Sequence, residues 1–408
     1  MARKMKDSGI EWIGEIPEGW ETQKLKYYAT VTSGEILSRD EYDFSGDIPV
    51  IGSNGKIGTT YKSNNHSEVI TTGRVGTIGT AQIVQDAWIT DNALIIKSHS
   101  INRPFLTYVI PNFDFKFMLS GTAQPLITAT KLKNQYIPVP SSEVQDKLVQ
   151  YLNTQIFNLS HLISQACSSI ELYKKLKQVV ITQAVTKGVR GEREMKDSGV
   201  EWIGEIPKEW GRTKIKMIAS FFNGDRTSRY PQPSDFVDAG VAFLTSRNID
   251  SDEVDLSETK YITDDKYKSL SGAKIQIDDI IFCLRGSVGK CAINRTLSCG
   301  TVASSLATIR PKDIYPKYLL YFLLSNIAST QTTIFMNGTC AANLSAENVG
   351  NYYITLPNSA EQKEIADHLD AKCAEIDKLI AKKEQLVKEL ESYKKSLIYE
   401  VVTGKREV

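Results

Sequence analysis

The chain has 408 residues, of which 41 % are hydrophobic and 24 % are charged, and a chain of this length is expected to fold into roughly two to four domains. No apolar run approaches the about 20 residues that a membrane-spanning helix needs, and no apolar segment of the signal-peptide type follows the basic first residues, so we expect a cytoplasmic protein without a membrane partner. The net charge of +1 at pH 7 neither requires nor excludes nucleic acid, because a local basic patch is sufficient for binding.

A motif near the start of the chain returns almost unchanged in its second half. Residues 5–17 read MKDSGIEWIGEIP and residues 195–207 read MKDSGVEWIGEIP, at an offset of 190 (195 − 5). The segments 136–140 and 353–357, YIPVP and YITLP, align at an offset of 217 (353 − 136). The chain is therefore an internal duplication. Its second copy has gained 27 residues (217 − 190) between these ends.

Each copy contains a head that we expect to be rich in strands. In residues 18–140, short runs of Val, Ile, Thr and Tyr alternate with Gly, Asn and Pro, and a helix is expected in residues 104–119. The second copy repeats this plan, with strand-like runs between residues 241 and 309 and a helix expected in residues 316–329. We therefore predict an α+β fold, with one head in residues 1–140 and a second in residues 189–357.

A long helix is predicted after each head, in residues 141–188 and 358–408. Pro and Gly are absent from each segment until Gly188 and Gly404, which are expected to cap the helix C-termini. Ser142 with Gln145, and Ser359 with Gln362, have the spacing of a capping box, in which both side chains bond first-turn amides.

The hydrophobic residues of these helices recur at spacings of 3 and 4, which is the heptad pattern of a coiled coil. Two matched heptads in one chain predict that the helices pair with each other in antiparallel orientation. Each helix would have about 43 residues and extend roughly 65 Å. The predicted seam consists of Leu152, Ile156, Leu159, Ile163, Ile170, Leu369, Ile376, Ile380, Val387, Leu390 and Leu397.

Polar loops of the two heads contain the candidate DNA contacts. Arg, Lys, Asn and Ser side chains bind phosphates and base edges, although most polar loop residues are simply solvated. Glycines beside Arg74 and Arg285 would allow a close approach to DNA, and we align segment 74–79 with the shorter segment 285–289. The candidates are Ser53, Asn54, Lys56, Arg74 and Thr77 in the first head, and Arg226, Arg247, Asn248, Arg285, Ser287 and Lys290 in the second.

Catalytic and metal-binding motifs are absent from the sequence. The segment 286–290, GSVGK, lacks the spacing of a phosphate-binding loop and is followed by Cys291 where Ser or Thr is needed. No GxSxG, HExxH or C-x-x-C pattern occurs, and the six cysteines are scattered. We therefore expect a chain without a catalytic site and without a bound metal.

The repeated motif at residues 5–17 and 195–207, the unlike heads, and the helices ending in VTKG (185–188) and VTG (402–404) resemble the specificity subunit of type I restriction-modification enzymes. The resemblance covers essentially the whole chain. It implies that each head is a target recognition domain for one half of a bipartite site in duplex DNA, and that the paired helices set the gap. It also implies two methyltransferase subunits and two restriction-translocase subunits as partners. These partners would bind S-adenosylmethionine, ATP and Mg²⁺, and this chain would bind no cofactor.

Unlike heads on a repeated frame predict an asymmetric target, because site symmetry follows protein symmetry. A gap set by the helices would change if they were lengthened near Thr186. Two alternatives remain at this point. The chain could serve a methylation-only or otherwise related restriction system, or it could be a coiled-coil scaffold whose heads bind protein and not DNA.

Overall fold

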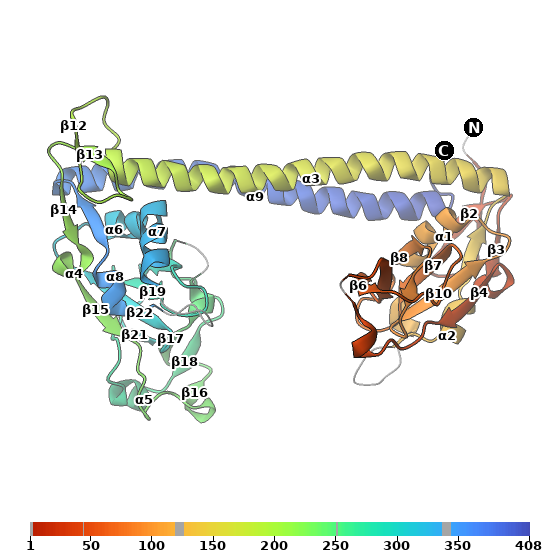
Figure 1. The fold of residues 1–408 in the computed structure, drawn as a ribbon, viewed down its shortest axis with the longest axis horizontal. Coiled ribbons are helices and arrows are strands. Elements are labelled where there is room, and N and C mark those ends of the chain that lie inside the picture. Colours follow the sequence, from red (N-terminus) through yellow and green to blue (C-terminus); the bar gives the residue numbers. More distant parts are fainter. Residues whose placement is uncertain (1–2, 44, 119–125, 250–251, 337–343) are drawn as a thin grey trace. The chain divides into compact units, whose positions relative to one another are not determined.

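The computed structural model describes residues 3–43, 45–118, 126–249, 252–336 and 344–408. The chain divides into two compact units (Figure 1). Unit 1 comprises Met1–Cys167 and Gln385–Val408, and unit 2 comprises Ser168–Glu384. Two long helices, α3 (Ser142–Lys187) and α9 (Ser359–Val402), each contribute one part to either unit. Among the described residues, no helix is both long enough and apolar enough to span a membrane.

The head of unit 1 is built from two larger sheets and two strand pairs. An antiparallel sheet has the order β4-β10-β7-β8, and a second sheet has the order β6-β5-β9, in which β5 and β9 are parallel. Helices α1 (Arg103–Val109) and α2 (Ala129–Lys133) complete the head. The strands are β1 (Met5–Asp7), β2 (Glu15–Pro17), β3 (Glu21–Lys24), β4 (Ala29–Ser33), β5 (Ile48–Gly52), β6 (Gly55–Thr60), β7 (Val69–Gly73), β8 (Ala81–Val84), β9 (Trp88–Ile89), β10 (Ala93–Ser98) and β11 (Tyr136–Val139).

The head of unit 2 repeats this topology with additions. The sheet β15-β22-β19-β20 corresponds to β4-β10-β7-β8, and β17 pairs with β21 in parallel as β5 does with β9. The strands are β12 (Met195–Asp197), β13 (Glu205–Pro207), β14 (Gly211–Lys214), β15 (Ala219–Asn223), β16 (Phe236–Val237), β17 (Val241–Leu244), β18 (Lys260–Ile262), β19 (Ile280–Cys283), β20 (Cys291–Ile293), β21 (Gly300–Val302), β22 (Leu306–Pro311) and β23 (Tyr353–Leu356). The helices are α4 (Ile215–Ile218), α5 (Asp264–Ser269), α6 (Pro316–Leu324), α7 (Asn326–Phe335) and α8 (Ala346–Gly350).

Equivalent backbone hydrogen bonds locate the residues that the second copy gained. The Thr90 amide donates to the Ile51 carbonyl in head 1, and the Ala303 amide donates to the Leu244 carbonyl in head 2. Leu244 and Ala303 are 59 positions apart, whereas Ile51 and Thr90 are 39 positions apart. Twenty of the 27 added residues therefore lie between these two points, where β18 and α5 also lie.

The helices predicted in residues 104–119 and 316–329 are both interrupted. In head 1, α1 ends at Val109 and only short 3-10 segments follow, since Pro111 supplies no backbone N–H for a longer α-helix. In head 2, the predicted helix divides at Ser325, whose hydroxyl accepts from the Ala328 amide and so caps α7.

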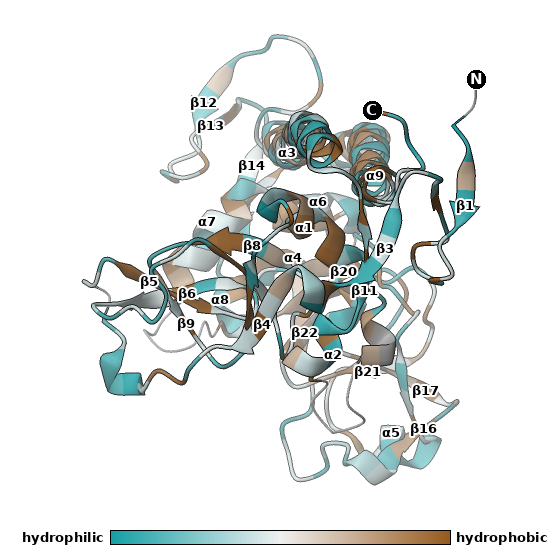
Figure 2. Ribbon diagram, turned by 90° about the vertical axis from the view of Figure 1, so that its right-hand side faces the viewer, coloured by the Kyte–Doolittle hydropathy of each residue, from teal (hydrophilic) through white to brown (hydrophobic). Residues whose placement is uncertain are grey.

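In each unit the two long helices run antiparallel. In unit 2, Lys177 of α3 lies 2.9 Å from Asp377 of α9, and Arg190, just beyond α3, lies 2.7 Å from Glu364. In unit 1, the first turns of α3 share a hydrophobic cluster with the last turns of α9. Figure 2 shows that both helices carry hydrophobic as well as hydrophilic residues. The predicted α+β fold, the duplication and the two long helices are confirmed.

The predicted seam residues are buried to different extents. Three lysines, Lys177, Lys383 and Lys394, interrupt the hydrophobic pattern and are partly exposed. Their stems can pack along the helices while their amines meet polar partners, as the Lys177 amine does with Asp252 and Asp377. Among the seam residues, Leu152, Leu159, Ile170, Leu369, Ile376 and Leu397 are buried, and Ile156, Ile163, Ile380, Val387 and Leu390 are partly buried.

The helix C-termini follow the sequence prediction, but the N-termini do not. Gly188 and Gly404 have φ of 77° and 72°, as expected for the left-handed residue that follows a helix. The capping boxes do not form as predicted, because Ser142 and Ser359 are already the first helical residues. At α9, the Asn358 side chain accepts from the Glu361 amide and takes the capping role.

The two capping-box glutamines instead join the helices to the heads. The Gln145 side chain donates to the Pro140 carbonyl and accepts from the Asn102 amide at the start of α1. Gln362 donates to Pro357 and accepts from the Tyr315 amide at the start of α6 in the same way. Both glutamines are 4 % exposed, so these bonds are shielded from water.

We expect Gln362→Ala to lower the free energy of unfolding of unit 2 by about 2–3 kcal/mol, because it leaves a buried N–H and a buried carbonyl unpaired. The measurement is urea unfolding followed by hydrogen-exchange mass spectrometry on peptides from α6 and β23. Lys363→Ala changes the next, exposed residue of the same helix and should have almost no effect. Equal unfolding midpoints for the two variants would contradict this role of Gln362.

Candidate nucleic-acid interface

In head 1, two adjoining loops bring the predicted contact residues together. The hydroxyl of Thr80, at the end of the β7–β8 loop, donates to the Ser53 carbonyl in the β5–β6 turn, at 3.3 Å. A Cβ at Gly73 would lie 1.8 Å from the Thr77 carbonyl oxygen and 2.6 Å from that of Ser53. Only glycine therefore permits this approach. Sequence analysis did not single out Gly73, although a glycine at the end of a strand-like run was a usable signal.

The five candidates of head 1 differ in exposure. Asn54, Lys56 and Thr77 are exposed, and Ser53 is half-buried. Arg74 is also half-buried, and its guanidinium donates to the Asp91 carbonyl at 3.3 Å. Arg74 thus braces the turn before β10 at the base of the loop, while the exposed candidates lie on the outer parts of both loops.

The loop alignment made from the sequence is wrong by one residue. The Arg74 amide donates to the Asn92 carbonyl, and in head 2 the Leu284 amide donates to the Ser305 carbonyl at the corresponding place. Leu284 is therefore the counterpart of Arg74, and the two loops are equal in length. The sequence alignment is off because the two equivalent residues differ in burial. Leu284 lies in the hydrophobic core, whereas Arg74 braces a turn.

The glycines of the two loops match in conformation. Gly76 and Gly286 have φ of 72° and 75°, and Gly79 and Gly289 have φ of 86° and 89°. With this alignment, Arg285 occupies the position of Val75, and Ser287 and Lys290 occupy those of Thr77 and Thr80. The same backbone loop therefore carries two cationic side chains, Arg285 and Lys290, in head 2 and one, Arg74, in head 1.

In head 2, the candidates surround one stretch of backbone. Backbone bonds from Leu284 to Ser305 and from Ala303 to Leu244 hold the ends of β19 and β17 against residues 303–305. The Arg226 guanidinium donates to the Ser304 carbonyl at 3.2 Å. The exposed residues that extend from this region are Arg226, Arg247, Arg285, Ser287 and Lys290.

Asn248 does not belong with these exposed residues. It is 1 % exposed, and its side chain accepts from the Thr245 amide and donates to the Asp255 carbonyl and the Thr259 hydroxyl. The amide group of Asn248 is thus fully used inside the loop. This corrects the sequence interpretation, since Asn248 holds the loop that carries Arg247 and presents no group to a ligand.

Asp225 is a buried carboxylate that sequence analysis missed. It accepts hydrogen bonds from the amide and hydroxyl of Thr227 and from the amide and hydroxyl of Ser271. Burial acts to raise the pKa of Asp225, but these four bonds outweigh burial and hold its pKa well below the usual range. Asp225 thereby fixes the loop that carries Arg226.

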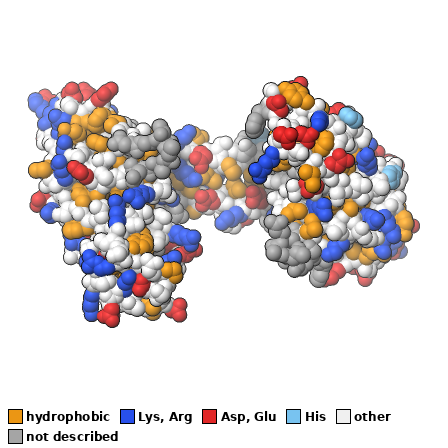
Figure 3. Space-filling model, turned by 60° about the horizontal axis from the view of Figure 1, so that its bottom comes forward, with side chains coloured by type: hydrophobic (Ala, Val, Ile, Leu, Met, Phe, Trp, Pro, Cys, Tyr) orange, Lys and Arg blue, Asp and Glu red, His pale blue; other side chains and the backbone are white. Residues whose placement is uncertain are grey.

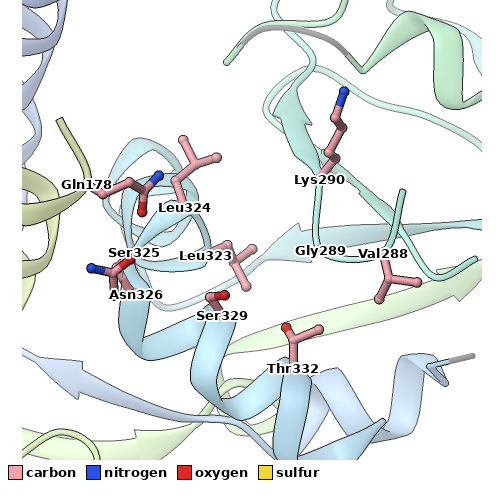
Figure 4. Close-up of a pocket in the computed structure, with 10 residues that line it drawn as sticks. All are labelled: Gln178, Val288, Gly289, Lys290, Leu323, Leu324, Ser325, Asn326, Ser329 and Thr332. Atoms are coloured by element: carbon pink, nitrogen blue, oxygen red, sulfur yellow. The ribbon is translucent and has the colours of Figure 1, made fainter. Parts of the chain in front are cut away.

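A cavity of about 400 Å³ adjoins the β19–β20 loop (Figure 4). It is lined by the loop residues Val288, Gly289 and Lys290, by the α6–α7 junction and by Gln178 of α3. In Figure 4, the Lys290 amine points away from the hydroxyls of Ser329 and Thr332. Figure 3 shows Lys and Arg side chains in several places on both heads, with Asp and Glu among them.

Two of the cysteines serve the core of head 2. Cys283 and Cys291 are buried in hydrophobic clusters, and burial raises the pKa of Cys283 to about 11. Among the described residues, no group of three or more His, Cys, Asp or Glu side chains is arranged to hold a metal ion.

The family model of the type I restriction modification DNA specificity domain matches the chain twice, at residues 17–171 and 207–389. The MjaVIII specificity subunit from Methanocaldococcus jannaschii is 24 % identical over 324 residues, which cover 78 % of this chain and 71 % of that subunit. The putative MjaX specificity subunit of the same organism is 26 % identical and covers 96 % and 95 % of the two chains.

A solved structure described as the basis of complex assembly and conformational transition of the type I R-M system has the same fold. Its TM-score is 0.70 with 15 % identity, over 96 % of this chain and 99 % of that chain. The chain therefore belongs to the family of type I restriction-modification DNA specificity proteins. It is a specificity subunit of such a system.

We expect Asp225→Asn to destabilise unit 2 by about 1–3 kcal/mol at pH 7, because the new amide N–H₂ meets the Ser271 amide, which is also a donor. The folded-state pKa of Asp225 lies below its unfolded value of about 4, so the stabilisation from the carboxylate is complete above that value and is lost as the pH falls. The difference between the two proteins should therefore shrink between pH 5 and pH 2. The stability difference is measured by unfolding each protein in urea and following hydrogen exchange in peptides from β15 and β22.

The matched control is Asp238→Asn, which changes an exposed aspartate of the same head. This variant should follow the unaltered chain at every pH. A difference for Asp225→Asn that stays constant or grows on acidification would contradict the assigned pKa shift.

Proposed function

We propose that this chain reads an asymmetric, bipartite sequence in duplex DNA, with one half-sequence recognised by each head. We further propose that it assembles with two methyltransferase subunits and two restriction-translocase subunits. S-adenosylmethionine, ATP and Mg²⁺ are then bound by those partners, and the chemistry occurs on them. The chain itself supplies recognition and holds the assembly together.

The observation that carries this proposal is a repeated framework with different side chains on equivalent loops. The turns after β5 and β17 present Asn54 and Arg247 at the same position. The loops after β7 and β19 present Val75 and Arg285 at the same position. Base edges are distinguished by the donors and acceptors that meet them, with Arg suited to guanine and Asn to adenine. Two heads with unlike donors on one framework are therefore suited to two unlike half-sequences.

Electrostatics supports DNA as the ligand more than a protein partner of the heads. Cationic side chains lie on exposed loops, while the carboxylate nearest to Arg226 in sequence, Asp225, is turned inward and fully hydrogen-bonded. Phosphates would therefore meet the exposed Arg226 guanidinium beside a carboxylate that is already engaged, and Arg247 forms only an exposed, 3.9 Å ion pair with Glu258. Contacts of this kind position a protein on DNA and make its affinity depend on salt.

Binding of the reconstituted complex with its methyltransferase to a duplex that contains the site should weaken by about 10³-fold or more between 50 and 200 mM salt. Arg285→Ala with Lys290→Ala should lower the slope of log affinity against log salt by about 2, since each lost phosphate contact contributes about 0.9. Lys363→Ala on α9 is the matched control and should leave the slope unchanged. Affinity that depends on neither salt nor sequence would support the protein-binding scaffold and refute the proposal.

We also propose that α3 and α9, which both run from one unit into the other, determine the number of unread base pairs between the half-sequences. The region near Thr186 is a poor place to test this, because the Val185 carbonyl accepts from the Thr355 hydroxyl and anchors the head. The unit boundaries are better, at Cys167–Ser168 in α3 and Glu384–Gln385 in α9.

Inserting four residues at both boundaries lengthens each helix by about 6 Å, which corresponds to one or two base pairs. The methylated motif should then keep both half-sequences and gain one or two base pairs in its gap, as read by sequencing of methylated DNA. Replacing residues 164–167 and 385–388 with the same four residues is the control, and its gap should not change. An unchanged gap in the insertion variant would place the spacer elsewhere.

A further inference from the structure

A lysine interrupts the heptad pattern at the equivalent place in each long helix. The two helices align at the offset of 217, which makes Lys394 the counterpart of Lys177 and Asp377 that of Ser160. In unit 2 the Lys177 amine donates to the Asp377 carboxylate at 2.9 Å, and in unit 1 the Lys394 amine donates to the Ser160 hydroxyl at 3.0 Å. The duplicated helices thus share one polar contact across each seam.

Lys177 has a second partner, which belongs to head 2. Its amine also donates to the Asp252 carboxylate, at 3.3 Å, whereas Lys394 forms no ion pair with any residue that the structure describes. Burial acts to lower the pKa of Lys177, but the charge of Asp252 and the contact with Asp377 outweigh burial and raise that pKa. The amine therefore stays positive between two carboxylates that would otherwise repel each other.

Asp252 lies in a segment that covers an edge of the main sheet in head 2. The Ile293 amide, at the end of β20, donates to the Asp252 carbonyl, and the Val254 amide donates to the Ile293 carbonyl. The registers of β8 and β20 make Ile83 the counterpart of Ile293 in head 1. Ile83 is 36 % exposed and Ile293 is 1 % exposed. The segment with Asp252 therefore covers an edge that head 1 leaves accessible to solvent.

The same segment holds the turn that carries Arg247. The Asp255 amide donates to the Asn248 carbonyl, and the Asn248 side chain donates to the Asp255 carbonyl. Asn248 directly follows Arg247, whose side chain is exposed. A short series of bonds thus leads from α9 through Lys177 and Asp252 to the turn of Arg247.

The position of this segment matters because base edges are recognised by hydrogen bonds, which require donors held within roughly 0.5 Å of the productive place. The bonds to Ile293 fix the segment relative to the sheet, and Lys177 fixes it relative to α3 and α9. Without the amine, the carboxylates of Asp252 and Asp377 would repel each other and displace the segment. Arg247 would then be displaced with it.

We propose that Lys177 is a positioning residue for DNA recognition by head 2, since it joins the turn of Arg247 to the two long helices through Asp252. The inference rests on the proposed function, in which head 2 reads one half-sequence. Lys177 itself touches no base. The equivalent lysine of unit 1, Lys394, joins only the two helices, so the recognition loops of head 1 do not depend on it.

The test uses the reconstituted complex with its methyltransferase, and duplexes in which single bases of the methylated motif are changed. Arg247→Ala identifies the half-sequence of head 2 as the one at which discrimination weakens. Lys177→Met keeps the side-chain length without the charge and should weaken discrimination about tenfold at that half-sequence alone. Hydrogen exchange of the Asp255 amide should rise at least about tenfold, because the segment is no longer held at Asp252.

Two variants separate positioning from a general loss of stability. Asp252→Asn should match Lys177→Met, and the double variant should be no weaker than either, because the lysine acts through Asp252. Lys177→Arg keeps the positive charge and should retain discrimination at both half-sequences. If Lys177→Met does not fold, Asp252→Asn makes the same test at a partly exposed position.

The matched control is Lys394→Met, which should leave both half-sequences unchanged. Equal loss at both half-sequences, or no loss in either variant, overturns the positioning role and leaves the proposed function intact. An Arg247→Ala variant that discriminates as the unaltered chain does has the same consequence. An unaltered complex that prefers no sequence overturns both.

Discussion

The junction between each head and the first turns of a long helix repeats one set of buried hydrogen bonds, and the position of the loops depends on it. Gln145 and Gln362 bridge the last strand of the head to the first turn of α1 or α6. A second contact reinforces each bridge, as the Tyr108 hydroxyl donates to Asn153 and the Tyr321 hydroxyl to Asp370.

These contacts matter because buried hydrogen bonds are directional. A glutamine that donates to one segment and accepts from another fixes the angle between them more narrowly than apolar packing does. Burial raises the pKa of Tyr108 and of Tyr321, so both hydroxyls keep their protons and remain donors throughout the neutral range. A head held in this way can present its loops to a ligand in one orientation.

The two copies are alike where they form the junctions and differ in their exposed loops. Residues of the junction, the repeated motif and the helix ends recur in both copies, whereas the exposed loop positions differ. The copies differ in length mainly within the heads, chiefly between β17 and β21. A frame of this kind allows the exposed loops of one head to change while the junctions and the helix ends stay the same.

Much of this architecture could be predicted from the sequence because it depends on local patterns. Heptad spacing predicts long helices, and glycine after such a helix predicts its left-handed cap, as Gly188 and Gly404 confirm. The strand content could be predicted from local composition, and the duplication from a comparison of the chain with itself.

Features that depend on distant partners could not be predicted in this way. Gln145 and Gln362 have the spacing of a capping box. Each side chain instead accepts a hydrogen bond from a distant backbone amide, that of Asn102 or Tyr315, at the start of α1 or α6. Asn248 has the chemistry of a base contact, yet three neighbours in its own loop satisfy it. Whether a polar side chain faces solvent is decided by the tertiary structure, which is why the candidate interface was the weakest part of the sequence analysis.

The central claim is that two unlike heads on one repeated frame read two unlike half-sequences. The most direct measurement is the methylated-adenine motif in the DNA of cells that carry this chain together with its methyltransferase. The account predicts one motif with two different half-sequences separated by a fixed number of unread base pairs. A continuous motif, or a palindromic one with two identical halves, would contradict it.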